Sequence, residues 1–118
     1  MDEYNIDAKA EFAAIPERVA SGSAFFDQVY PGWHNKIDVN ELDVACNCFC
    51  IVGQLYGAYT YHAQRLFGGA AEGVPYGVYA DPLLMENIEY YEALTLAWIE
   101  AIALRHNTVA AERESLDA

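Results

Sequence analysis

The most obvious candidates for chemistry are three cysteines that lie within five residues of one another, Cys46, Cys48 and Cys50. A structural zinc site needs four tetrahedral ligands, which proteins usually supply as two closely spaced pairs. Only Cys46 and Cys50 have the spacing of such a pair, and the sequence offers no second pair of cysteines or histidines. We therefore interpret the cysteines as small buried side chains near the start of a helix, with no metal bound. A metal- or thiol-dependent function of this cluster is the alternative.

Other signatures of catalysis or metal binding are missing from the sequence. Asp38, Asn40 and Asp43 resemble part of a calcium loop, but Leu42 and Asp43 occupy the positions that need an oxygen ligand and a glycine. No G-x-S-x-G motif, Walker loop or dinucleotide fingerprint occurs, and none of the three histidines lies in a recognisable catalytic signature. The sequence supports no enzymatic activity, and we expect no catalytic residue and no cofactor.

The charge of the chain excludes two classes of partner. The 118 residues include 18 acidic and 6 basic side chains, which give a net charge of −12 and a pI near 4.3. Binding to nucleic-acid backbones or anionic membranes requires a positive surface, so neither is expected. The acidic N-terminus is unlike a signal peptide, and no clean run of about 20 apolar residues occurs. An odd number of clustered cysteines favours a reducing compartment, so we expect a cytoplasmic protein without a membrane span.

Aromatic and acidic side chains suggest a surface that binds another protein. Aromatic residues make up 14% of the chain, which is more than we expect one small core to need, and tyrosine is favoured at protein interfaces. The alternative is that these tyrosines line the core with their hydroxyls at its edge. The candidate partner-binding residues are Tyr59, Tyr76, Tyr79, Glu86, Glu89, Tyr90, Glu92 and Glu100.

Apolar residues at helical spacing indicate the first helices. The first helix covers residues 7–30 and either begins or kinks at Pro16, because proline lacks a backbone N–H. Asp38 and Glu41 have the spacing of a capping box, which predicts a short helix beginning at Asp38. A central helix is expected over residues 45–67.

The last helix is expected over residues 83–113, with Asp81 as its N-cap and Pro82 at its first position. At 1.5 Å per residue it would be about 46 Å long, more than a compact domain of this size needs. We therefore expect it either to break near residues 106–107 or to pack against a second copy of the chain. Residues 74–80 are interpreted as an aromatic loop, with a β-hairpin as the alternative.

These elements predict an all-α fold, a compact bundle of three main helices plus one or two short ones. We expect a single domain over residues 1–118, with frayed ends at 1–6 and 114–118. Two glycines four residues apart in the central helix suggest close approach of another backbone, and a glutamine beside them is expected to pin the turn after Gly32. The residues with expected structural roles are Trp33, Asp38, Gly53, Gln54, Gly57 and Trp98.

One long string in the chain resembles a known family. Residues 25–33 read FFDQVYPGW, residues 37–43 read IDVNELD, and residues 50–57 read CIVGQLYG. The segment 24–57 is similar to a family of small proteins from actinobacteria and their bacteriophages, whose pattern is LLDExxPGWxxxIDLxxLDL followed by CVLGQLYG. The resemblance implies an actinobacterial or phage origin and no assigned biochemical activity. Of the three cysteines, only Cys50 matches a recurrent cysteine of the family.

Our leading hypothesis is a small acidic, phage-encoded protein that acts by occupying a host or phage protein. Complementary charge would speed its association with a basic partner, and the hypothesis includes mimicry of a nucleic acid by carboxylates. The cysteine cluster is the first alternative. The second is a homodimeric accessory protein that uses the last helix as its interface.

Overall fold

The structure is a computed structural model that describes the backbone of residues 8–80 and 87–117 and the side chains of residues 9–80 and 87–107. It contains five α-helices and two 3₁₀ helices over these residues, and no β-strand. In chain order they are α1 (Ala8–Ala13), α2 (Ile15–Val29), η1 (Trp33–Asn35), α3 (Ile51–Leu55), α4 (Tyr59–Phe67), η2 (Ala71–Tyr76) and α5 (Ile88–Asp117). The predicted all-α fold is confirmed, with α2, α4 and α5 as its three main helices.

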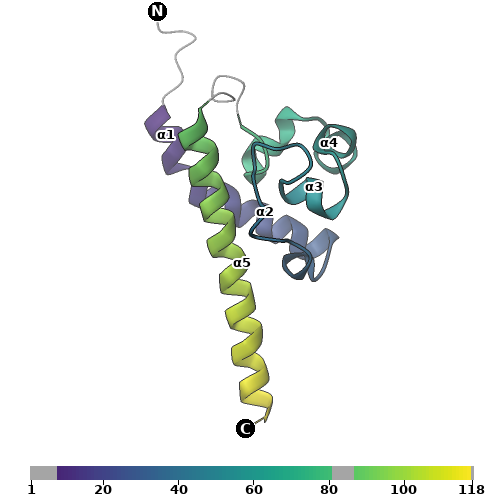
Figure 1. Ribbon diagram of the computed structural model, residues 1–118, viewed down its shortest axis with the longest axis vertical. Helices are drawn as coiled ribbons and strands as arrows, with labels where there is room; N and C mark the ends of the chain where they lie inside the picture. Colours follow the sequence, from purple (N-terminus) through teal and green to yellow (C-terminus); the bar gives the residue numbers. More distant parts are fainter. Residues whose placement is uncertain (1–7, 81–86, 118) are drawn as a thin grey trace, which may run out of the picture.

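The long helix α5 dominates the arrangement. Figure 1 shows α5 crossing α2, with α3 and α4 to one side and the C-terminal turns of α5 extending beyond the other helices. The helix is continuous for 30 residues, so the expected break near residues 106–107 does not occur. The expected start with Asp81 and Pro82 lies outside the described residues. The backbone N–H of Tyr90 donates to Asn87 Oδ1 at 3.0 Å, the geometry of a helix N-cap.

The N-terminal helical segment divides close to Pro16, as the sequence predicts. Helix α1 ends at Ala13, and Pro16 lies in the first turn of α2, where a missing N–H leaves no hydrogen bond unmade. Helix α2 ends at Val29, and Gly32 follows with a φ of +80°. That left-handed conformation turns the chain into η1 at little steric cost only for glycine.

The prediction of one central helix over residues 45–67 is wrong. Residues 45–50 form turns, and two short helices, α3 and α4, follow with a break between them at Gly57, whose φ is +113°. Each helix has its own cap. Cys50 Sγ accepts a hydrogen bond from the Gly53 N–H at 3.3 Å in α3. At α4, Asn47 Oδ1 accepts from the Thr60 N–H at 3.0 Å, so a side chain 13 residues away caps the helix.

The segment between η1 and α3 is a loop, and no helix begins at Asp38. Asp38 Oδ1 accepts from the Asn40 N–H at 2.9 Å, which closes a local turn instead of capping a helix. Gln54 holds this turn from α3: its Oε1 accepts from the Asp38 N–H at 2.7 Å. Its Nε2 donates to the backbone oxygens of Asp38 and Phe49 at 3.2 and 3.1 Å. The Gln54 amide is thus hydrogen-bonded, as expected. The turn that it holds is the one at Asp38, however, and not the predicted one directly after Gly32.

The core lies where α2, η1, η2 and α5 meet. Trp33 and Trp98 are both fully buried, with ring centroids 5.6 Å apart and planes nearly perpendicular. The Trp98 indole N–H donates to the Gly77 backbone oxygen at 2.8 Å, which ties α5 to the end of η2. Gly22 allows α2 to approach this ring, because a Cβ there would lie 2.8 Å from the Trp98 side chain.

Candidate protein-binding surface

Two of the tyrosines expected at a binding surface are core residues instead. Tyr59 is 3% exposed, and its hydroxyl donates to the Ala70 backbone oxygen at 2.6 Å. Burial raises the pKa of the Tyr59 hydroxyl above its ordinary value. Tyr90 is 0% exposed, and its hydroxyl accepts a hydrogen bond from Arg18 Nη1 at 2.7 Å. Tyr59 and Tyr90 therefore follow the alternative interpretation, in which tyrosines line the core and their hydroxyls form hydrogen bonds at its edge.

Tyr76 and Tyr79 are half-buried and packed against other aromatic rings. The Tyr76 ring stacks on Phe67 with centroids 5.2 Å apart, and the Tyr79 ring stacks on Tyr59 at 5.3 Å. Both belong to an aromatic cluster around η2 that fills the space between α2 and α4. Residues 74–80 therefore follow the expected aromatic loop in part, with the 3₁₀ turn of η2 in place of a hairpin.

The acidic residues expected at the surface do lie there. Glu89, Glu92 and Glu100 are exposed on α5, while Glu86 lies outside the described residues. Residues three, four, seven or eleven positions apart on a helix share one face, so these three carboxylates point to the same side of α5. Together with Leu96 we call them the α5 face, defined by Glu89, Glu92, Leu96 and Glu100.

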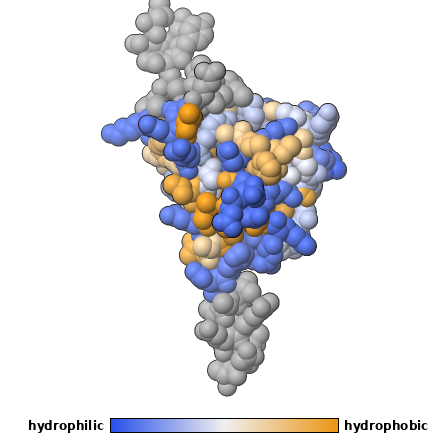
Figure 2. Space-filling view, in the orientation of Figure 1, coloured by the Kyte–Doolittle hydropathy of each residue, from blue (hydrophilic) through white to orange (hydrophobic). Residues whose placement is uncertain are grey.

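Leu96 is the member of the α5 face that the sequence analysis missed. It is 62% exposed and lies four residues from Glu92 on one side and from Glu100 on the other. Ile88, the first residue of α5, is 72% exposed. Leu94 and Trp98 are fully buried, and these two fix which side of α5 meets the core. Along α5, Figure 2 shows patches of hydrophobic surface interrupted by hydrophilic residues.

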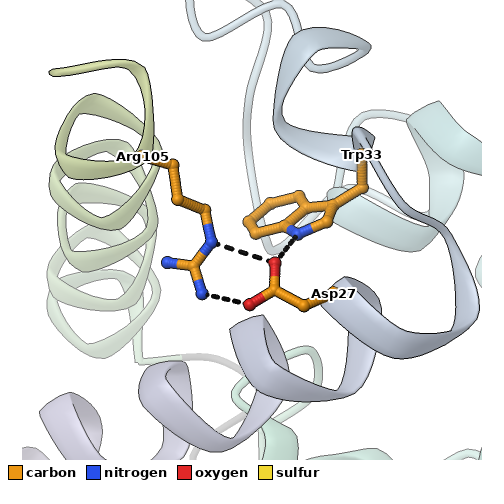
Figure 3. A network of polar contacts seen from close by, with 3 residues as sticks. All are labelled: Asp27, Trp33 and Arg105. Carbon is orange, nitrogen blue, oxygen red and sulfur yellow. Dashed lines mark hydrogen bonds and ion pairs between the residues drawn. The ribbon is translucent and has the colours of Figure 1, made fainter. Parts of the chain in front are cut away.

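In the part of α5 whose side chains are described, no basic side chain forms an ion pair with the α5 face. Arg105 is the only lysine or arginine among residues 87–107, and it is turned toward α2. Its Nε donates to Asp27 Oδ1 at 3.1 Å and its Nη2 to Asp27 Oδ2 at 2.6 Å. The Trp33 indole N–H also donates to Asp27 Oδ1, at 2.9 Å (Figure 3). These hydrogen bonds, Arg105 first, lower the pKa of Asp27.

The three cysteines do not converge on a site. Cys48 is exposed, Cys46 is partly buried and Cys50 is buried. Burial raises the pKa of the Cys50 thiol to about 11, whereas a metal ligand or nucleophile needs the thiolate. Among the described residues, no group of three or more His, Cys, Asp and Glu side chains is placed to hold a metal ion.

A pair of histidines lies beside the Asp27–Arg105 contact. The rings of His34 on η1 and His106 on α5 have centroids 5.1 Å apart, and His106 Nε2 lies 3.2 Å from the His34 backbone oxygen. His34 Nδ1 is buried without a hydrogen-bond partner in the described part of the chain. Burial, then the nearby His106 and Arg105, lower the pKa of His34, and only Asp27 acts in the opposite direction.

The described residues form an all-α fold with one long helix, whose exposed face carries three glutamates and a leucine. The chain itself matches no protein-family model, no curated protein and no solved structure. In the described part of the chain, none of the helices combines the length and hydropathy of a membrane span.

Proposed function

We propose that the protein binds a host or phage protein through the α5 face, and that its partner presents a basic surface. The observation that carries this proposal is the composition of the face, three exposed carboxylates around the exposed side chain of Leu96. An isolated exposed leucine is ordinary on a protein surface. An exposed apolar side chain beside several charges of one sign fits an interface that has an apolar centre and an electrostatically complementary rim.

The net charge of −12 supports a basic partner, because the attraction acts before contact and raises the association rate. A partner that normally binds nucleic acid satisfies this requirement, since carboxylates can occupy the places of phosphates. In that case the protein acts as a competitor for the nucleic-acid site and does not itself bind nucleic acid. Because residues 24–57 resemble actinobacterial and phage proteins, we look for the partner in the cytoplasm of actinobacteria.

The continuous helix α5 also keeps the homodimer as a second candidate. Its C-terminal turns extend beyond the other helices and could pair with those of another copy (Figure 1). A dimer through the α5 face itself is disfavoured, because each copy would present carboxylates and no lysine or arginine to the other.

The test is affinity capture from nuclease-treated actinobacterial lysates, from uninfected and phage-infected cells, read by mass spectrometry. A triple variant, E89Q/E92Q/E100Q, removes the charge of the face. Its matched control, E17Q/E41Q/E72Q, removes the same charge from exposed residues elsewhere. A basic protein captured by the wild type and the control but lost with the face variant supports the proposal. Equal capture by all three proteins contradicts it.

A further inference from the structure

A groove runs along α5 next to the α5 face. It lies between the helix and the loop segment 42–45, is open to solvent and has a volume of about 600 Å³. The loop is fixed to the helix beside it, because the Val44 N–H donates to Thr95 Oγ1 at 3.1 Å. The groove is therefore bounded on one side by a helix and on the other by a segment tied to that helix.

Apolar side chains make up more than half of the lining of this groove. Leu42 and Tyr91 are the buried ones among them. Ile88 and Leu96 flank it and are 72% and 62% exposed. These two are eight residues apart on α5, which is about 12 Å along the helix axis. Two turns of a docking helix present apolar residues over a similar distance, at positions i, i+4 and i+7 or i+8.

Acidic side chains border the apolar surface. Asp43 lines the groove from the loop and Glu92 lines it from α5, and both are exposed. Glu89 lies one turn before Glu92 on the same face of the helix. An occupant with apolar side chains directed into the groove must therefore place its flanking residues against carboxylates on both sides.

We infer that this groove receives an amphipathic helix of the partner, with apolar residues between Ile88 and Leu96 and lysine or arginine opposite Asp43 and Glu92. The inference rests on the proposed function and deepens it, since it names the element that the partner contributes. The α5 face of a second copy of this chain does not fit, because its charged residues, Glu89, Glu92 and Glu100, would meet Asp43 and Glu92 with charge of the same sign. The volume lies in the range of small-molecule pockets, but acids on both borders favour a long basic occupant.

The test uses two synthetic peptides of about 18 residues, long enough to form a helix in water. One carries leucines at i, i+4 and i+7 and lysines on the flanks, and the matched peptide has glutamate in place of every lysine. Binding to the ¹⁵N-labelled protein is followed by NMR chemical shifts and by fluorescence anisotropy. The protein variants are Leu96→Ala and D43N/E92Q, in which asparagine can still accept the 3.0 Å hydrogen bond that Asp43 Oδ1 receives from the Ala45 N–H.

We expect the lysine peptide alone to bind, with the largest shifts at Leu42, Ile88 and Leu96. Each variant should weaken binding about tenfold, the effect of losing one central interface contact. Leu104→Ala is the matched control, because Leu104 is 66% exposed on the same helix but does not line the groove. It should bind the peptide like the wild type.

Three results overturn the inference: equal binding of the glutamate peptide, equal effects of Leu96→Ala and Leu104→Ala, or a Leu96-dependent dimer of the protein in light scattering. If E89Q/E92Q/E100Q abolishes capture of a basic protein while the lysine peptide does not bind, the groove inference fails and the proposed function stands. If capture is also insensitive to these glutamates, both fail.

Discussion

Arg105 on α5 and Asp27 on α2 form a two-point ion pair across 78 residues of sequence. The two hydrogen bonds measure 3.1 and 2.6 Å, and Asp27 Oδ1 also accepts from the Trp33 indole N–H (Figure 3). The Arg105 guanidinium lies 5.5 Å from the centroid of the Trp33 ring. This contact joins α2, η1 and α5, so it helps to fix the rotation of α5 that turns the α5 face outward.

Removing this ion pair should loosen α5 from α2. We expect Arg105→Ala to lower the free energy of unfolding by about 1 kcal/mol, a value reduced by solvent screening because the Asp27 side chain is 46% exposed. Lys36→Ala, which removes an exposed positive charge elsewhere, should change stability by less than about 0.5 kcal/mol. Urea unfolding measures both variants, and equal effects would show that the ion pair does not hold α5.

Acidification should destabilise the protein through His34. Its folded-state pKa is lowered, so the unfolded chain binds the proton more readily, and stability falls as the pH drops through the ordinary value of 6.5. We expect the melting temperature to fall between about pH 7 and pH 5 and to fall less in His34→Gln. NMR titration of the folded protein should place the pKa of His34 below 6.5. A pKa above 6.5 would contradict the burial of the His34 ring against η1 and α5 that lowers it here.

Gly53 should reject a side chain although it lies in a helix. Glycine to alanine in a helix interior usually stabilises by about 0.5–1 kcal/mol. Here a Cβ would lie 2.5 Å from the Cys48 carbonyl carbon and 2.6 Å from its oxygen. Gly53→Ala should therefore destabilise by about 2 kcal/mol, as overpacking does, while Ser21→Ala on the exposed side of α2 should be nearly neutral. Thermal unfolding that shows Gly53→Ala to be stabilising would disprove this close approach.

The cysteines should differ in reactivity and should not depend on metal. Exposed Cys48 should react with a thiol reagent well before Cys50, which is buried and whose pKa is about 11. Mass spectrometry after short labelling identifies the modified residue. We expect a chelator and the C46S/C48S variant to leave the melting temperature unchanged. Stoichiometric zinc in the purified protein, with melting that depends on it, would favour the metal alternative instead.

The fold class could be predicted because periodicity and local signals agree in α2 and in most of α5. The end of α2 could be predicted as well, because the residues that stop it, Pro31 and Gly32, follow it directly in the sequence. The central helix could not be predicted, because its termination depends on distant partners. Asn47 caps α4 from 13 residues away, and Gln54 bonds to Asp38 across 16 residues. A periodic pattern contains none of these contacts, so residues 45–67 read as one helix.

The candidate site was only partly predictable for a different reason. Exposed glutamates are placed correctly because buried carboxylates are rare. Tyrosine suits a core and an interface equally well, so the burial of Tyr59 and Tyr90 depends on packing that composition does not specify. Leu96 was missed because its exposure follows from the phase of α5, which the buried pair Leu94 and Trp98 sets.

The most direct test of the central claim is the affinity of the purified protein for the basic partner it captures, measured by calorimetry at several salt concentrations. The proposal predicts that E89Q/E92Q/E100Q weakens binding about 30-fold at low salt, roughly 2 kcal/mol, and that added salt shrinks this difference. The control E17Q/E41Q/E72Q should bind nearly as tightly as the wild type. Equal affinities of the two triple variants would contradict the claim that the α5 face is the binding surface.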